Sequence, residues 1–298
     1  MFLKPGDTVA IISSARKISH QEIDCAVRFL SSKGLTVKVG KTIDSQYNQF
    51  AGDDCLRAED LQWAISDKDI KAVFFARGGY GSVRIVDKVD FTPLVSNPKL
   101  FIGYSDVCVF LNHLYFRYNL PSVHGIMPVN INDETLNSEA VYSLENAIFG
   151  KGIRYVWKNK GRIADCSVKG TVIGGNLSIL YSLLGSESFG STDDKILFIE
   201  DLDEYLYHID RMMQALKRAG KLSKLKALLI GSMTQMHDNT VPFGRNALQI
   251  IEEAVKEYGY PVISDFKAGH IEGENHAIII GKEASIDIRG ENISLCQQ

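Results

Sequence analysis

Apolar and polar residues alternate in blocks over about the first 120 residues, and the blocks predict strands that alternate with helices. Short apolar runs, several of them rich in Val and Ile, predict buried strands at 7–13, 35–40, 72–77 and 99–105. Apolar residues at helical spacing predict the intervening helices at 19–34, 56–66 and 106–118. This order predicts an α/β fold in which helices cover both faces of a parallel sheet.

The first of these helices carries its own start and stop signals. Ser19 and Glu22 have the spacing of a capping box, in which each side chain accepts a hydrogen bond from the other residue's backbone. Gly34 is typical of the residue that follows a helix, because glycine adopts a left-handed conformation without steric cost. The periodic residues between these signals predict one buried helical face.

The pattern changes after about residue 150, where Gly and Lys replace the long helical periods. We therefore expect a first domain at 1–150, a linker at 151–165 and a second domain at 166–298. Helices in the second domain are predicted at 209–220 and 243–259, and a further helix is expected to start at Asn176 within the segment 174–186. Strands are predicted at 195–201 and 227–233, followed by short strands in YPVISDF, AIIIG and SIDI.

Composition argues against several classes of protein. The 298 residues are 45% hydrophobic and 23% charged, with a net charge of −3, which argues against a nucleic-acid partner or an anionic membrane. The N-terminal residues lack the apolar core of a secretory signal, and no apolar run is long enough to span a membrane, so we expect a cytoplasmic protein. Five scattered cysteines without a Cys-x-x-Cys pair indicate buried thiols in a reducing compartment, and they suggest neither a zinc knuckle nor a redox motif.

Ser105 is the first candidate for chemistry, because it stands where a buried strand passes into a helix in FIGYSDVCVF. The carboxyl ends of parallel strands carry the ligand sites of α/β proteins, and free N–H groups at a helix start can stabilise an oxyanion. The backbone N–H of Asp106 is the obvious donor. A strict G-x-S-x-G elbow is not met because Val107 replaces the last glycine, and a helix-capping serine fits the same pattern.

The segment RGGYGS at 77–82 also follows a predicted strand. Its glycines do not have the spacing of a dinucleotide-binding or phosphate-binding loop. Adjacent glycines allow close approach of a backbone, so the loop either forms a plain tight turn or supplies a second oxyanion N–H, for which we choose Gly79.

An acid and a base remain to be assigned. The strand at 195–201 ends in Glu200 and Asp201, and Glu200 either orients a histidine or serves in an ion pair. His270, in a Gly-His turn, and His124, at a strand end, can both reach a cleft. Three other histidines fit a helix, a helix start and a polar loop better: His113, His20 and His237, in that order.

Taken in order, several segments resemble those of the LD-carboxypeptidase family of serine peptidases, which also includes microcin C immunity peptidases. The matching segments are R-G-G-Y-G (77–81), P-K-L-F-I-G-Y-S-D (98–106), V-H-G (123–125), G-G-N-L-S-I-L (174–180), L-F-I-E-D-L-D-E-Y-L-Y-H-I-D-R (197–211) and G-H (269–270). The likeness covers nearly the whole chain.

The resemblance implies a role for individual residues. It implies Ser105 as nucleophile, His270 as base and Glu200 as the residue that orients the base, with the amides of Asp106 and Gly79 as oxyanion hole. It also implies a flavodoxin-like N-terminal domain that carries the serine, a smaller β-rich C-terminal domain that carries Glu and His, and a homodimer. Neither a metal nor a cofactor is expected.

The implied substrate is a peptidoglycan tetrapeptide whose terminal D-alanine follows a diamino acid. A carboxypeptidase must bind a free carboxylate, for which Arg77 and Arg211 are candidates, although either also suits a structural ion pair. Asn176 either contacts substrate or caps a helix. Two other functions stay open: hydrolysis of a peptide–nucleotide amide, as in microcin immunity, and binding of a solute without catalysis. The segment between Ser186 and Asp194 has only Phe189 to stack on a nucleotide base.

Overall fold

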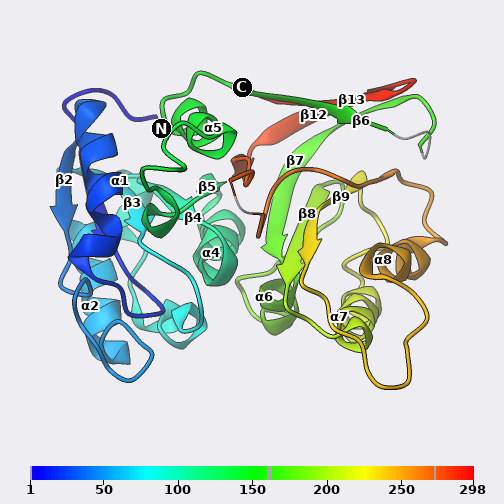
Figure 1. Ribbon diagram of the computed structural model, residues 1–298, viewed down its shortest axis with the longest axis horizontal. Helices are drawn as coiled ribbons and strands as arrows, with labels where there is room; N and C mark the ends of the chain where they lie inside the picture. Colours follow the sequence, from blue (N-terminus) through cyan, green and yellow to red (C-terminus); the bar gives the residue numbers. More distant parts are fainter. Residues whose placement is uncertain (1, 160–162, 272) are drawn as a thin grey trace.

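The computed structural model describes residues 2–159, 163–271 and 273–298, and it contains two sheets that lie side by side (Figure 1). The first sheet has the strand order β11-β5-β4-β3-β1-β2. Its strands are β1 (Thr8–Ile12), β2 (Thr36–Val39), β3 (Ile70–Phe75), β4 (Leu100–Gly103), β5 (Ser122–His124) and β11 (Ile278–Ile280). Strands β1 to β5 pair in parallel, which confirms the predicted α/β class, and only β11 is antiparallel to its neighbour.

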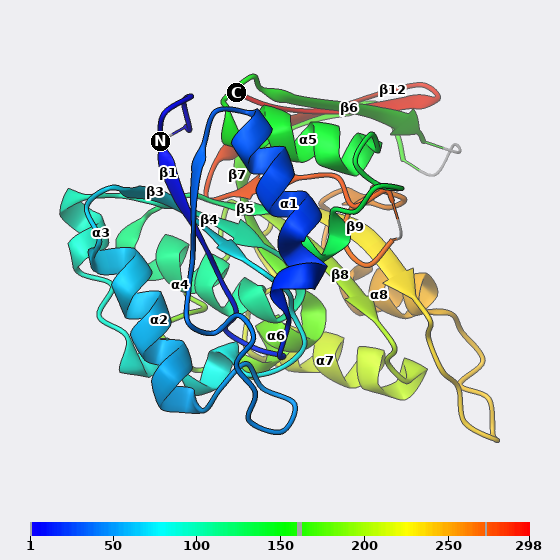
Figure 2. The ribbon, with the colours of Figure 1, turned by 60° about the vertical axis from the view of Figure 1, so that its left-hand side comes forward.

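Helices cover both faces of this sheet, and Figure 2 shows α1 on one side with α2, α3 and α4 on the other. These helices and α5 have the bounds α1 (His20–Ser32), α2 (Asp54–Ser66), α3 (Pro93–Ser96), α4 (Cys108–Tyr118) and α5 (Glu139–Ile148). Buried residues of α1 and α5 form one core with alternate residues of β1, such as Val9 and Ile11. The other residues of β1, Ala10 and Ile12, face α2 and α4, as the two-residue period of a strand requires.

The second sheet has the order β10-β9-β8-β7-β12-β13-β6 and is half parallel and half antiparallel. Its strands are β6 (Ile153–Lys158), β7 (Cys166–Asn176), β8 (Ile196–Leu202), β9 (Ala227–Thr234), β10 (Val262–Ile263), β12 (Glu283–Arg289) and β13 (Asn292–Gln297). The long strand β7 changes partner along its length: Cys166 to Thr171 pair with antiparallel β12, and Val172 to Asn176 pair with parallel β8. The parallel half therefore ends at one edge, where β7 and β8 present Asn176 and Glu200.

Three helices pack on the parallel half: α6 (Leu177–Ser182), α7 (Leu206–Arg218) and α8 (Ala247–Val255). We call each sheet with its helices a lobe. The buried faces of these three helices belong to the same apolar cluster as α2 and α4 of the first lobe. Figure 1 shows α4 between the two sheets. Because one apolar core runs through both lobes, the edges of the two sheets are held in a fixed relation.

Several element bounds differ from the expected ones. Residues 153–158 of the expected linker form strand β6, and residues 160–162 of that linker lie outside the described residues. Residues 174–176 belong to β7, and α6 begins directly after Asn176, as expected for a helix that Asn176 caps. The glycine pair Gly174-Gly175 lies against β8 and α4, where a Cβ atom would clash, so the end of β7 approaches both elements closely. The division at 1–150 and 166–298 stays a prediction.

Candidate active site

A cavity of about 670 Å³ lies where the carboxyl ends of strands from both sheets meet. Six of the eight residues singled out in the sequence line it: Arg77, Gly79, Ser105, Asp106, Asn176 and His270. Strands β3 and β4 lead into the first four, and β7 leads into Asn176. The site thus occupies the position that parallel sheets provide for ligands.

Ser105 has a backbone conformation that a serine seldom adopts. Its φ angle is 62°, in the left-handed region, and it is the first residue of a short 3-10 helix at Ser105–Val107 directly after β4. Tyr104 occupies the N-cap position, so the helix-capping alternative for Ser105 does not hold. Non-glycine residues in this region cost on the order of 1–3 kcal/mol and occur where the surrounding structure enforces them. Here the sharp turn directs the hydroxyl into the cavity.

The glycine loop after β3 reaches the serine through Gly78. A Cβ atom added to Gly78 would lie only 2.9 Å from both Cβ and Oγ of Ser105. Gly79, the residue chosen as oxyanion donor, has a φ of 121°, and a Cβ there would meet the side chain of Arg16 at 2.6 Å. Both glycines are needed for close approach, and the direct neighbour of the hydroxyl is Gly78, which the sequence reasoning missed.

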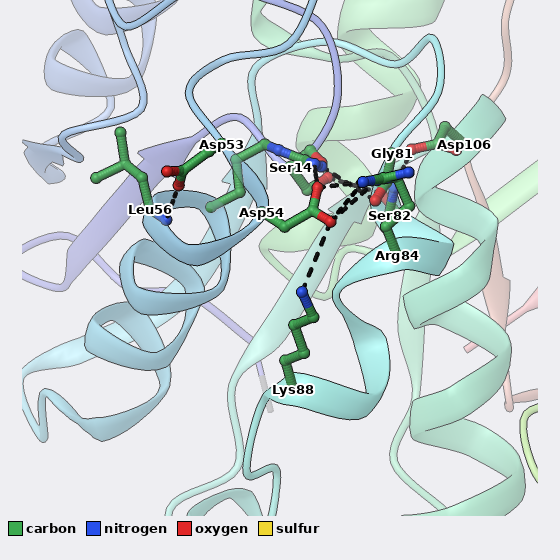
Figure 3. A network of polar contacts seen from close by, with 10 residues as sticks. Ser14, Asp53, Asp54, Leu56, Gly81, Ser82, Arg84, Lys88 and Asp106 are labelled. Carbon is green, nitrogen blue, oxygen red and sulfur yellow. Dashed lines mark hydrogen bonds and ion pairs between the residues drawn. The ribbon is translucent and has the colours of Figure 1, made fainter. Parts of the chain in front are cut away.

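A buried polar network ties this loop to the turn that carries Ser105 (Figure 3). The carboxylate of Asp106, which is 1% exposed, accepts a hydrogen bond of 2.8 Å from the backbone N–H of Ser82. The buried guanidinium of Arg57 donates to the carbonyls of Gly81 and Ser14, at 3.0 and 2.5 Å. Burial raises the pKa of Asp106. The side chain of Asp106 thus fixes the two backbone segments that carry the predicted oxyanion amides.

His270 and Glu200 form the opposite side of the site. The Nδ1 atom of His270 lies 2.7 Å from Oε2 of Glu200, whose side chain is fully buried. A Cβ at Gly269 would lie 2.5 Å from the same carboxylate oxygen, so only glycine lets the backbone pass this closely. The hydroxyl of Thr234 donates to the carbonyl of His270 at 3.0 Å and fixes the turn.

The attraction between opposite charges affects the pKa values of Glu200 and His270 more than their burial does. Burial acts to raise the pKa of Glu200, but the imidazoles of His270 and His124 lower it more, and the pKa falls to about 2. For His270, burial acts to lower the pKa, but the Glu200 carboxylate and its hydrogen bond raise it above the usual value. The carboxylate is therefore ionised at neutral pH and favours the Nδ1–H form of the imidazole, which leaves Nε2 as the free nitrogen.

Asn176 and Asp201 occupy the edge of the cavity next to Glu200. The Asn176 amide oxygen accepts from the N–H of Ile179 at 3.1 Å, so the helix-capping role expected for Asn176 is present. Its amide nitrogen donates to Asp201 at 2.9 Å. Burial and the charge of Glu200 raise the pKa of Asp201 to about 7. Asn176 therefore lines the cavity while its amide is engaged by the protein.

The two predicted arginines differ in position. Arg77 lines the cavity and lies 3.4 Å from Glu22, a half-exposed ion pair. Arg211 is exposed on α7, where its guanidinium carbon lies 5.1 Å from the centre of the Tyr207 ring, and it is not among the described residues that line the cavity. Arg16 does line it and was missed, although its place just after the first strand could have indicated it.

The other histidines considered as bases do not line the cavity. His124 is fully buried and does not line the cavity, and buried His113 contacts Ser188 at 2.9 Å. Of the histidines in the described segments, His270 alone lines the cavity.

Comparison with known proteins identifies the family. The model of the LD-carboxypeptidase N-terminal domain matches residues 9–125, and the model of the LD-carboxypeptidase C-terminal domain matches residues 169–286. The chain belongs to the LD-carboxypeptidase family. The resemblance inferred from the sequence motifs is thereby confirmed, and so is an enzyme of the serine peptidase class.

Several relatives match the chain over almost its whole length. A Bacillus subtilis protein named "Probable murein peptide carboxypeptidase" is 33% identical, over 96% of this chain and 90% of that protein. The crystal structure of muramoyltetrapeptide carboxypeptidase from Oxalobacter formigenes is 26% identical with a TM-score of 0.88, and the match covers 97% of this chain and 98% of that one. The microcin C7 self-immunity protein MccF of Escherichia coli is 24% identical, over 99% of this chain and 95% of that protein.

The structure describes no helix that combines the length and apolar character needed to cross a membrane. All five cysteines are free thiols, but the prediction that they are buried holds only for Cys108, since Cys55 is exposed and the other three are partly exposed.

Proposed function

We propose that the chain is a serine-type LD-carboxypeptidase that releases the terminal D-alanine from tetrapeptide fragments of peptidoglycan. One observation carries the proposal: Ser105, on its left-handed turn, shares a cavity with His270, and the far nitrogen of that imidazole is held by buried Glu200. The names of the Bacillus and Oxalobacter relatives support the substrate class.

The first chemical step is attack by the Ser105 hydroxyl on the carbonyl carbon of the terminal peptide bond. His270 accepts the hydroxyl proton at Nε2 as the C–O bond forms, and the carbonyl electrons move to the oxygen. Glu200 keeps the imidazole in the required tautomer and stabilises the imidazolium that results.

The oxyanion hole consists of the backbone N–H groups of Asp106 and Gly79. Asp106 follows the nucleophile at the start of a helical turn, where N–H groups have no intrahelical partner. The bond from Ser82 to the Asp106 carboxylate holds the glycine loop against this turn. Preorganised donors are effective because they need no rearrangement as charge develops, and one donor contributes roughly 10²–10³ in rate.

The second half of the reaction reverses the proton transfer. His270 returns its proton to the nitrogen of the departing D-alanine as the C–N bond breaks, which leaves an ester on Ser105. Water then attacks the ester carbonyl and gives a proton to His270. The bond between the carbonyl carbon and the Ser105 oxygen breaks as His270 passes this proton to that oxygen, and the shortened peptide leaves with a carboxyl group. Every proton taken by the imidazole is given back, so the cycle closes.

The free carboxylate of the terminal D-alanine is proposed to bind Arg77 at the cavity wall, with Arg16 nearby. A guanidinium matches a carboxylate with two parallel hydrogen bonds. Replacing Arg77 by Ala is expected to raise KM by about 10-fold with a smaller change in kcat, the signature of lost ground-state binding. Arg211→Ala is the matched control, because Arg211 is an exposed arginine away from the cavity.

Release of D-alanine from defined tetrapeptides, followed by mass spectrometry, tests the function. We expect release by the purified chain, loss of release in Ser105→Ala, and unchanged release in Ser122→Ala, which removes a buried hydroxyl outside the cavity. Full activity of Ser105→Ala would contradict the proposal. A panel with meso-diaminopimelate or lysine, with and without sugar, identifies the preferred substrate.

Hydrolysis of a peptide–nucleotide amide is the alternative that the likeness to MccF raises. Phe189, the aromatic residue considered for base stacking, is 2% exposed and packs edge-on to Phe116, so it cannot stack on a nucleotide. An aminoacyl-nucleotide amide in the same assay separates the two substrates. A serine-directed probe that forms no adduct on Ser105 would instead favour a non-catalytic binding protein.

We further propose that the enzyme acts in the cytoplasm as a homodimer, in agreement with its five free thiols and with the family resemblance. Sedimentation equilibrium of the purified chain tests the dimer.

A further inference from the structure

His124 lies at the contact between the two sheets, where the proposed mechanism assigns it no role. It is the last residue of β5, it pairs with Gly103 of β4 and Ile278 of β11, and it is 0% exposed. Its ring stands edge-on to Phe198 of β8, with 5.0 Å between centroids. Strand β8 also carries Glu200, so the imidazole of β5 faces the carboxylate that serves His270.

Two polar groups at this contact lack hydrogen-bond partners in the described parts of the chain. Neither nitrogen of His124 has one, and neither does Oε1 of Glu200. The Nε2 atom of His124 lies 3.8 Å from that oxygen, while the other oxygen of Glu200 lies 2.7 Å from His270. Buried polar groups without partners cost about 1–3 kcal/mol each, and these two are complementary, one a donor and one an acceptor.

We propose that His124 is a positioning residue of the LD-carboxypeptidase reaction, whose protonated Nε2 faces Oε1 of Glu200 at 3.8 Å so that the carboxylate is held between two imidazoles. The proposal rests on the function proposed above, since it assigns His124 to the orientation of the base. A fully buried ring that does not line the cavity cannot take a proton from Ser105, so His124 acts through Glu200 alone.

The charged and titratable neighbours determine how His270 should respond. Glu200 and Asp201 of β8 face His270, and Tyr104, at the end of β4, places its ring 4.8 Å from it. Burial and the charge of the same carboxylate raise the pKa of the Cys108 thiol on α4. A donor on Oε1 withdraws charge from Glu200 and weakens its hold on an imidazolium. Removing that donor therefore makes the carboxylate more basic and raises the pKa of His270.

The pKa of His270, measured by NMR of the imidazole in a Ser105→Ala background, tests the proposal without any need for turnover. In His124→Phe, which keeps an aromatic ring against Phe198, we expect this pKa to rise by about 0.5–1 unit. In His124→Gln, whose amide can donate, it should stay close to the parent value. His113→Phe, which removes a buried histidine outside the site, should leave it unchanged.

Kinetics supply a second readout in the active enzyme. His124→Phe is expected to lower kcat by about 10–100-fold with little change in KM, because Glu200 loses one of its two supports. The acid limb of kcat/KM should move to higher pH by the same amount as the NMR titration. His124→Gln should restore most of the loss.

An unchanged His270 titration in a folded His124→Phe protein would overturn the proposal. If that variant does not fold, the nitrogen shifts of His124 in the parent protein decide: a proton on Nε2 that exchanges slowly supports the contact, and a proton on Nδ1 excludes it. A shift of the His270 pKa in a chain that releases no D-alanine would leave the contact intact and reject the proposed function.

Discussion

The two sheets supply the cavity in different ways. The first sheet contributes Ser105 through backbone geometry, with a φ of 62° and a loop so close that Gly78 has no room for a Cβ. The second contributes Glu200, which holds His270 of the loop between β10 and β11 through buried charge. The carboxylate is 0% exposed and lies 2.7 Å from the imidazole. Substitutions on the first side should therefore act through shape, and those on the second through pH-dependent charge.

The largest effect is expected on the charged side. Glu200→Gln keeps the size of the side chain but removes the charge that selects the imidazole tautomer, and kcat should fall by about 10⁴-fold. Because the carboxylate raises the pKa of His270, that pKa should also fall in the variant. Steady-state kinetics and NMR titration measure the two quantities. A loss of activity without a change in the pKa of His270 would show that the charge of Glu200 does not control the imidazole, and would contradict the role of charge on this side of the cavity.

A slightly smaller effect is expected on the backbone side. In Gly78→Ala the new methyl group would stand 2.9 Å from the Ser105 hydroxyl, so kcat should fall by about 10²–10³-fold at every pH tested. Gly259→Ala is the matched control, because a Cβ there meets nothing within 4 Å. A pH-dependent defect in Gly78→Ala would contradict a purely steric origin.

Acid should destabilise the charged side selectively. The pKa of Glu200 is about 2 in the folded protein and near 4.5 when unperturbed, so its stabilising contribution is present above pH 4.5 and is lost as the pH falls toward 2. The shift corresponds to about 3 kcal/mol of unfolding free energy.

Glu200→Gln should therefore show a shallower loss of stability between pH 5 and pH 2 than the parent, in urea titrations at fixed pH. Glu291→Gln, at a side chain that is 86% exposed, should follow the parent curve. Parallel curves for Glu200→Gln and the parent would show that the carboxylate is not held as an anion.

The smallest effect concerns the strain of the nucleophile turn. Ser105→Gly should be more stable than Ser105→Ala by about 1 kcal/mol, because only glycine adopts a φ of 62° without steric cost. Both variants lack the nucleophile, so the difference reports the backbone alone. Equal thermal stability of the two would mean that the turn stores no strain.

Local patterns predicted most of the nucleophile side. The strand and helix around Ser105, the capping box at Ser19 and the close-approach glycines are all encoded within a few residues of where they act. The choice between Gly78 and Gly79 was not predictable, because it depends on how the loop after β3 meets the turn after β4. Arg16 was missed for the same reason, as its loop joins the cavity only when β1 pairs beside β3.

Long-range contacts decided the other side. Motif resemblance suggested Glu200 and His270, yet nothing local brings together residues separated by 70 positions. Their contact requires that the turn at Gly269 pass over the end of β8, and that an apolar core hold the two lobes together. Packing between distant segments likewise decided three other outcomes. Arg211 lies away from the cavity, His124 is buried, and part of 151–165 forms a strand.

The amino-acid sequence by itself determined the α/β class, the parallel first sheet and the family, because hydrophobic period, turn residues and motif order are local properties. The tertiary structure alone decided which candidates share a cavity and which carboxylate oxygen faces which imidazole. The physical reason is that burial and Coulomb interaction depend on distances between segments, and those distances exist only after the two lobes have packed.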